Sequence, residues 1–157
     1  MNSRRLIVAY AGRHQRPAWK PLYDDYRTRI ERDLPVEERF IKVRGSSEDP
    51  GRLRAEGAAL LAALPDPCWT FALDASGKRF DSPGFAARLA QLRREWPHPV
   101  AFLIGSDLGL HAEVLKGARG RLSLGSMILG HELARLVLYE QIYRALAIEK
   151  GSGYHRA

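Results

Sequence analysis

Tyr154, His155 and Arg156, near the end of the sequence, are three side chains that together suit work on a nucleotide. A tyrosine ring can stack on a base, an imidazole can exchange a proton near neutral pH, and a guanidinium can hold a phosphate or a developing anion. We therefore interpret them as candidate catalytic residues, with Tyr154 stacking, His155 accepting a proton and Arg156 holding the anion. The alternative is a frayed terminus with chance polar residues.

Two further polar pairs lie in residues 131–148, a stretch that is apolar on almost every side. His131 and Arg135 are four residues apart, as are Glu140 and Arg144, and this spacing places each pair on one side of a helix. A helix of this kind is buried in a core or an interface, so its charges must be paired or face a site. RNA contact and a structural role stay open for His131, Arg135 and Arg144.

The elements that must position these residues follow from apolar runs and their breakers. Strands are expected near 6–10, 36–43, 69–73, 100–104 and 121–124, and helices near 21–34, 52–64, 82–96, 111–117 and from about 130 onward. Continuous rather than alternating apolar runs are typical of strands buried on both faces. They predict the α/β class, a mostly parallel sheet with helices on both faces.

Local signals add detail to this prediction. Residues 75–79 are expected to form a turn, and Asp81 or Ser82 to cap the helix that follows. The second helix is expected to turn five apolar residues inward: Leu53, Ala58, Leu60, Leu61 and Leu64. No linker divides the chain, so residues 1–157 are expected to form a single domain.

Composition narrows the classes of partner and chemistry. The net charge of +7 favours a polyanionic partner, above all nucleic acid, although a soluble protein can simply be basic. Cys68 is the only cysteine, so there is neither an internal disulfide nor a cysteine-based zinc site, and the five histidines show no metal-ligand spacing. We therefore predict no metal. With no apolar stretch long enough to cross a membrane and no signal-peptide core, a cytoplasmic protein is expected.

Ligands of open α/β sheets collect at the carboxyl ends of strands, and three such ends stand out here. They are Leu73-Asp74, Ile104-Gly105 and the turn from Gly125 to Gly130. None matches a dinucleotide-binding fingerprint, a P-loop or a serine-hydrolase elbow, so those functions gain no support. Glycine after a strand is by itself most often only a turn.

Taken together, these stretches resemble the RlmH family of SPOUT-class RNA methyltransferases from end to end. The Glu140-to-Ala145 block and the Tyr-His-Arg ending, at this chain length, carry most of the resemblance. The other matching stretches are Val8 to Gly12 with Trp19 and Tyr26, Leu73-Asp74 with Gly77-Lys78, Phe102 to Gly105, Gly109-Leu110, Leu122 to Leu124, and His131 with Arg135.

The resemblance implies a deep trefoil knot in the C-terminal half, a homodimer, and S-adenosylmethionine held bent in the knot. The implied cofactor contacts are Leu73, Gly105, Gly125, Ser126, Met127, Ile128, Leu129 and Gly130. The implied reaction is methylation of N3 of a pseudouridine in the helix 69 loop of 23S ribosomal RNA on assembled ribosomes. In that case His131, Arg135 and Arg144 become candidate RNA-binding residues.

Two departures from the family pattern bear on the cofactor site. The family usually shows Ile-Gly-Gly-Pro-x-Gly, whereas this chain has Ser106 and Asp107 between Gly105 and Leu108. It also lacks the prolines that flank the family's histidine, which corresponds to His131. Two alternatives therefore remain: a non-catalytic ribosome- or RNA-binding module that kept the fold, and a SPOUT methyltransferase that acts on transfer RNA.

Overall fold

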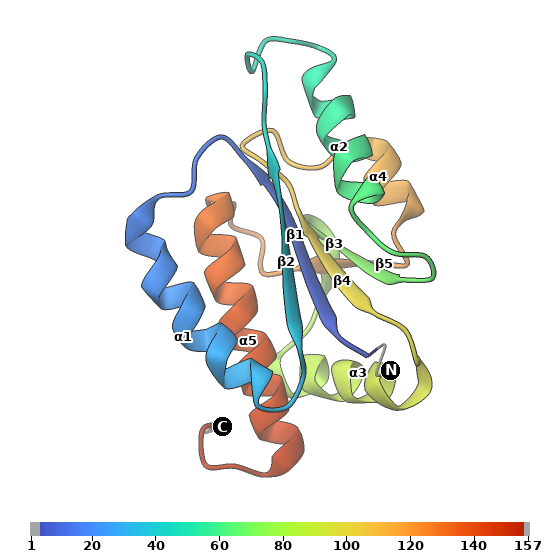
Figure 1. Cartoon of the computed structure of the whole chain (residues 1–157). Helices are drawn as coiled ribbons and strands as arrows, with labels where there is room; N and C mark the ends of the chain where they lie inside the picture. Colours follow the sequence, from blue (N-terminus) through green and yellow to red (C-terminus); the bar gives the residue numbers. More distant parts are fainter. Residues whose placement is uncertain (1–3, 156–157) are drawn as a thin grey trace.

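A computed structural model describes residues 4–155 of the chain (Figure 1). Its five strands form one sheet in which every pairing is parallel, in the order β2-β1-β4-β3-β5. The strands are β1 (Leu6–Gly12), β2 (Val36–Lys42), β3 (Trp69–Arg79), β4 (Val100–Ile104) and β5 (Gly120–Ser123). The helices are η1 (Pro17–Trp19), α1 (Lys20–Glu31), α2 (Arg52–Ala62), α3 (Ser82–Glu95), α4 (Ala112–Gly117) and α5 (His131–Lys150).

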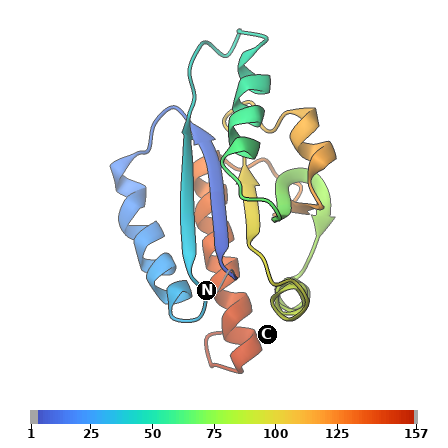
Figure 2. The ribbon, with the colours of Figure 1, turned by 45° about the vertical axis from the view of Figure 1, so that its right-hand side comes forward.

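Helices cover both faces of the sheet, which confirms the predicted architecture (Figures 1 and 2). Strand β1 shows how the layers separate, because successive side chains of a strand point to opposite faces. Val8 and Tyr10 belong to the larger core cluster, which the sheet forms with α1, α3 and α5. Ala9 and Ala11 belong to the smaller one, formed with α2 and α4. Seven consecutive buried residues in β1 explain why its apolar run is continuous.

The ends of two helices follow from local chemistry. Asp81 caps α3 as predicted, since its carboxylate accepts a hydrogen bond of 2.7 Å from the Gly84 amide. Helix α5 ends at Lys150 because Gly151 takes a left-handed conformation, with φ of +70°. This reversal directs the chain that follows back along the last turns of α5.

The prediction of a turn at residues 75–79 was wrong. These residues do not end the strand, because β3 bulges after Leu73 and resumes pairing with β5 at Lys78 and Arg79. Local composition favoured a turn, but a neighbouring strand was available to pair with the chain beyond the bulge.

The inward face of α2 also differs from the prediction. Leu60 is buried as expected, but Leu61 is 40% exposed, and the buried positions near the start of the helix are Arg52 and Glu56. The helix is therefore rotated relative to the apolar pattern, because a polar pair occupies positions that the pattern assigned to solvent.

Candidate functional site

An open pocket of about 360 Å³ lies beside the carboxyl ends of β4 and β5 and the bulge of β3. Ligands bind at this edge of parallel sheets, and small-molecule pockets commonly measure ~300–1,000 Å³. Its walls come from three segments that are distant in sequence, residues 73–75, 107–110 and 122–129, together with Ala134 at the start of α5. The location agrees with the strand ends singled out from the sequence.

Most of the predicted cofactor contacts belong to this pocket. Leu73, Gly125, Met127, Ile128 and Leu129 line it. The other three, Gly105, Ser126 and Gly130, are not among its lining residues; Gly130 precedes α5, and Ser126 lies in the exposed loop. The cofactor role of all eight stays a prediction.

Gly105 fixes one wall of the pocket through its close approach to Gly109. A Cβ atom at this position would lie 2.2 Å from the carbonyl oxygen of Gly109, a distance that no real contact tolerates. The two residues are held together by a tight turn, in which the Gly109 amide donates to the Ser106 carbonyl at 2.9 Å. A side chain at Gly105 would therefore displace residues 107–110, which form one wall.

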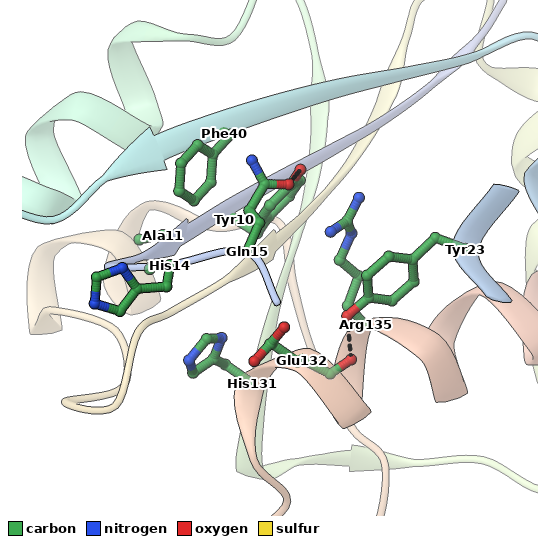
Figure 3. Close-up of a pocket in the computed structure, with 10 residues that line it drawn as sticks. Tyr10, Ala11, His14, Gln15, Tyr23, Phe40, His131, Glu132 and Arg135 are labelled. Carbon is green, nitrogen blue, oxygen red and sulfur yellow. Dashed lines mark hydrogen bonds between the residues drawn. The ribbon is translucent and has the colours of Figure 1, made fainter. Parts of the chain in front are cut away.

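The first turn of α5 lies near the end of β1 and lines a second, very small pocket (Figure 3). Tyr23 donates a hydrogen bond of 2.8 Å to the carbonyl oxygen of Glu132, shown as a dashed line. The Glu132 carboxylate in turn accepts from Arg16 at 2.7 Å. His131 is half-buried here, and its ring would lie 3.3 Å from a Cβ atom placed on Gly12. The start of α5 is thus fixed to the loop after β1.

Arg135 is buried among aromatic rings in the same region (Figure 3). Its guanidinium carbon lies 3.7 Å from the ring centre of Tyr10 and 3.9 Å from that of Tyr23, and an Nη atom pairs with Glu38 at 3.0 Å. Burial raises the pKa of Tyr23 to about 12, although the positive charge of Arg135 opposes that rise. These contacts favour the structural role for Arg135 over RNA contact.

The predicted catalytic tail folds back onto the last turns of α5. Tyr154 packs edge-on against Tyr143, with ring centres 4.6 Å apart, and its hydroxyl donates to Glu140 at 3.2 Å. Arg144 pairs with Glu140 at 2.6 Å and approaches Nδ1 of His155 at 3.3 Å. Burial raises the pKa of Tyr154 to about 12, so its phenol is protonated at neutral pH. Arg156 lies outside the described residues.

The tail and the pocket occupy different parts of α5. Ala134 lines the pocket and Arg144 holds the tail, and ten helical residues at 1.5 Å each separate them by about 15 Å along the axis. Figure 1 shows the C-terminal tail at the end of the molecule opposite the tips of β1 and β4. Within one chain, Tyr154 and His155 therefore do not reach the predicted cofactor site.

The model of a family described as "Predicted SPOUT methyltransferase" matches residues 4–155. This chain belongs to the SPOUT methyltransferase family.

Relatives of this SPOUT methyltransferase include full-length matches. The chain is 38% identical over 156 residues to "Ribosomal RNA large subunit methyltransferase H" of Oleidesulfovibrio alaskensis, covering 99% of both chains. It is 40% identical over 156 residues to the protein of the same name in Solidesulfovibrio magneticus, again covering 99% of both. The resemblance inferred from the C-terminal residues is therefore confirmed.

Solved structures agree with the SPOUT fold. The chain matches a probable methylase family protein from Haemophilus influenzae with a TM-score of 0.55 and 13% identity, covering 100% of this chain and 72% of that one. A structure described as giving insight into the 2-OH methylation of C/U34 on tRNA matches with a TM-score of 0.50 and 21% identity, covering 91% and 97%. At these identities the likeness concerns the fold alone.

Reasoning from the sequence missed part of the pocket of this SPOUT methyltransferase. The lining residues not proposed as contacts include Asp74, Ala75, Leu108, Leu122, Leu124 and Ala134. Strand-end position could have indicated Asp74, and the matched Leu122-to-Leu124 stretch could have indicated its two leucines. No pattern in the sequence indicated Ala134 as a pocket residue, because an alanine in an apolar helix is typical of a hydrophobic core.

Two features are absent from the described residues. Among residues 4–155, no three His, Cys, Asp or Glu side chains come together in a way that could hold a metal ion. No helix in the described part of the chain is long and apolar enough to cross a membrane.

Proposed function

We propose that this protein transfers a methyl group from S-adenosylmethionine to ribosomal RNA of the large subunit. We further propose that the acceptor is N3 of a pseudouridine in the helix 69 loop of 23S ribosomal RNA, on the assembled ribosome in the cytoplasm. The observation that carries the proposal is the pocket at the strand ends, whose walls include five of the contacts implied by the resemblance. The names of the full-length relatives support the ribosomal substrate.

The pocket residues fit this cofactor. The apolar walls, among them Leu108, Leu122 and Leu124, suit an adenine ring, and Asp74 offers negative charge to a cationic ligand. When bound, the cofactor supplies an electrophilic methyl group, so no metal is required. The task of the chain is to align the acceptor, which can contribute roughly 7–11 kcal/mol.

The tail has to handle the proton that leaves N3. Nδ1 of His155 lies 3.3 Å from a guanidinium nitrogen of Arg144, and we assign proton acceptance to His155. We assign base stacking to Tyr154 and the holding of the phosphate or developing anion to Arg156.

We propose that the tail completes the pocket of a second copy in a homodimer. Within one chain, Arg144 holds the tail and Ala134 lines the pocket, and the two lie about 15 Å apart along α5. This separation supports the arrangement. The exposure of Met127 at 83%, Ile128 at 93% and Leu133 at 40% supplies apolar surface beside the pocket that a second copy could cover.

We also propose that the segment after β5 passes beneath an earlier loop to form the trefoil knot. Residues 124–129 run back from β5, at the edge of the sheet, and line the same pocket as residues 107–110, which follow β4. Helix α5 then packs against α1 and α3 on one face of the sheet. A knot of this kind requires the chain to return from the edge strand β5 past the loop that follows the inner strand β4.

Two measurements test the function. Calorimetry should show S-adenosylmethionine binding at micromolar concentration, and no binding at millimolar concentration would favour the non-catalytic module. Methyl transfer to ribosomes should depend on pseudouridine in helix 69; equal transfer without it, or transfer only to transfer RNA, would overturn the substrate assignment.

In the Arg156→Ala variant we expect transfer to be lost while cofactor affinity stays near that of the wild type.

A further inference from the structure

A buried arginine on α2 joins that helix to the turn after β4, which forms one wall of the pocket. Arg52 is 2% exposed, and its Nη2 atom donates to the Asp107 carboxylate at 2.5 Å. Its Nε atom donates to Glu56, one turn further along α2, at 2.7 Å. Arg52 therefore bridges a buried carboxylate of the helix and a carboxylate of the turn.

Ser106 makes the second connection between the same two elements. Its hydroxyl donates to Glu56 at 2.7 Å and lies 3.4 Å from Arg52 Nη2 and from the Leu108 amide. Glu56 is 5% exposed and Ser106 is 7% exposed, so these bonds form away from water. We name Arg52, Glu56, Ser106 and Asp107 the α2 clamp.

Two members of the clamp, Ser106 and Asp107, belong to the turn that follows β4, and both bond to α2. A proline stiffens a turn covalently, because its ring fixes φ. Here hydrogen bonds and an ion pair to a neighbouring helix hold the turn instead.

Burying these charges is costly, and a buried ion pair is weak evidence for a gain in stability. Arg52 Nη1 has no hydrogen-bond partner among the described residues, so the network does not satisfy every donor. The geometry of the clamp does fix the position of residues 106–108 against α2. Asp107 and Leu108 both line the pocket.

We infer that Arg52 is a positioning residue of this enzyme, which holds the turn 105–109 in the shape that receives the methyl donor. The inference rests on the proposed function for the identity of the ligand, and it adds a residue that touches neither donor nor acceptor. Preorganising a loop increases affinity by removing the cost of ordering it on binding. Loss of Arg52 therefore weakens donor binding and leaves the chemical step largely intact.

The test compares Arg52→Met with Arg54→Met, a matched change at an exposed arginine of the same helix. Methionine keeps much of the side-chain volume and brings no charge into the core. In Arg52→Met, we expect the Kd and KM for S-adenosylmethionine to rise about tenfold, with kcat within about threefold of wild type. Arg54→Met should match the wild type in all three.

A second variant separates positioning from general damage. Asp107 follows Ser106 as the second residue of a turn that is closed by the Gly109 amide and the Ser106 carbonyl, a position that favours proline. Arg52→Met combined with Asp107→Pro should recover most of the donor affinity, because the ring restores stiffness without the ion pair. Failure of that rescue, together with a lowered urea midpoint, would assign Arg52 to structure alone.

A third measurement needs no ligand and keeps this inference separate from the proposed function. Hydrogen exchange of the amides in residues 105–110 should be faster in Arg52→Met than in the wild type and in Arg54→Met. If the wild type binds no donor, the proposed function fails and exchange still tests the clamp. Equal exchange in all three proteins, or unchanged donor affinity in Arg52→Met, would overturn the inference.

Discussion

At the scale of single residues, the two arginines of α5 differ in what surrounds them. Arg135 lies between the rings of Tyr10 and Tyr23 and pairs with Glu38, whereas Arg144 is partly exposed and holds Glu140 and the tail. The sequence showed that both charges must be paired, and they are. It did not show the partner of Arg135, because Glu38 lies 97 positions away on β2 and no local pattern connects them.

Replacing Arg135 by Ala should destabilise the fold by about 3 kcal/mol, because it breaks the ion pair between a buried arginine and Glu38, which keeps Tyr139 and Arg27 as partners, and removes a cation from two aromatic rings. Urea unfolding followed by circular dichroism measures the effect, and Arg94→Ala, at an exposed position of α3, is the control. An unchanged midpoint with weaker ribosome binding would instead restore the RNA-contact role.

Burial raises the pKa of the Cys68 thiol to about 11. Since the folded-state value exceeds the unfolded value of about 8.5, folding favours the protonated thiol. That contribution is complete below pH ~8.5 and is lost as the pH rises toward 11. The difference in unfolding free energy between wild type and Cys68→Ala should therefore shrink from pH 8 to pH 10. A difference that widened over this range would contradict the assignment.

At the scale of elements, the turn 105–109 depends on glycine at its first position. A Cβ atom on Gly105 would overlap the carbonyl of Gly109, so Gly105→Ala should force the turn away from its place in the pocket wall. We expect donor affinity in calorimetry to fall by roughly tenfold, about 1.4 kcal/mol. Gly117→Ala is the matched control, because its added methyl group meets open space. Equal affinity in the two variants would show that the turn tolerates displacement.

The elements were also the most predictable level of the structure. Apolar runs and breakers indicated the five strands and the main helices, since these signals are local. The extension of β3 and the rotation of α2 were missed because each depends on a distant partner, β5 in one case and the turn after β4 in the other. The sequence predicted those parts of the pocket lining that follow strand ends, but it gave no indication of Ala134 on α5.

At the scale of the whole molecule, the separation of tail and pocket predicts that each active site of a dimer draws on both copies. Mixing Gly105→Ala, whose donor affinity is expected to be about tenfold lower, with Arg156→Ala, which is expected not to transfer, should then raise activity in mixed dimers when the donor concentration is below the wild-type KM. With random reassociation, half the dimers are mixed and each has one intact site, so we expect about a quarter of wild-type activity. Methyl transfer after co-refolding measures this. No recovery would show that the tail serves its own chain.

The two outer strands of the sheet limit how copies can aggregate. An unpaired strand edge invites pairing with another chain, which charged side chains and short length prevent. At one edge, β2 presents Arg39 and Lys42 as exposed charges, and at the other, β5 has only four residues. Crowded molecules of this protein should therefore resist forming amyloid-like ribbons, so mutations that lengthen β5 or neutralise β2 are the ones expected to lower solubility.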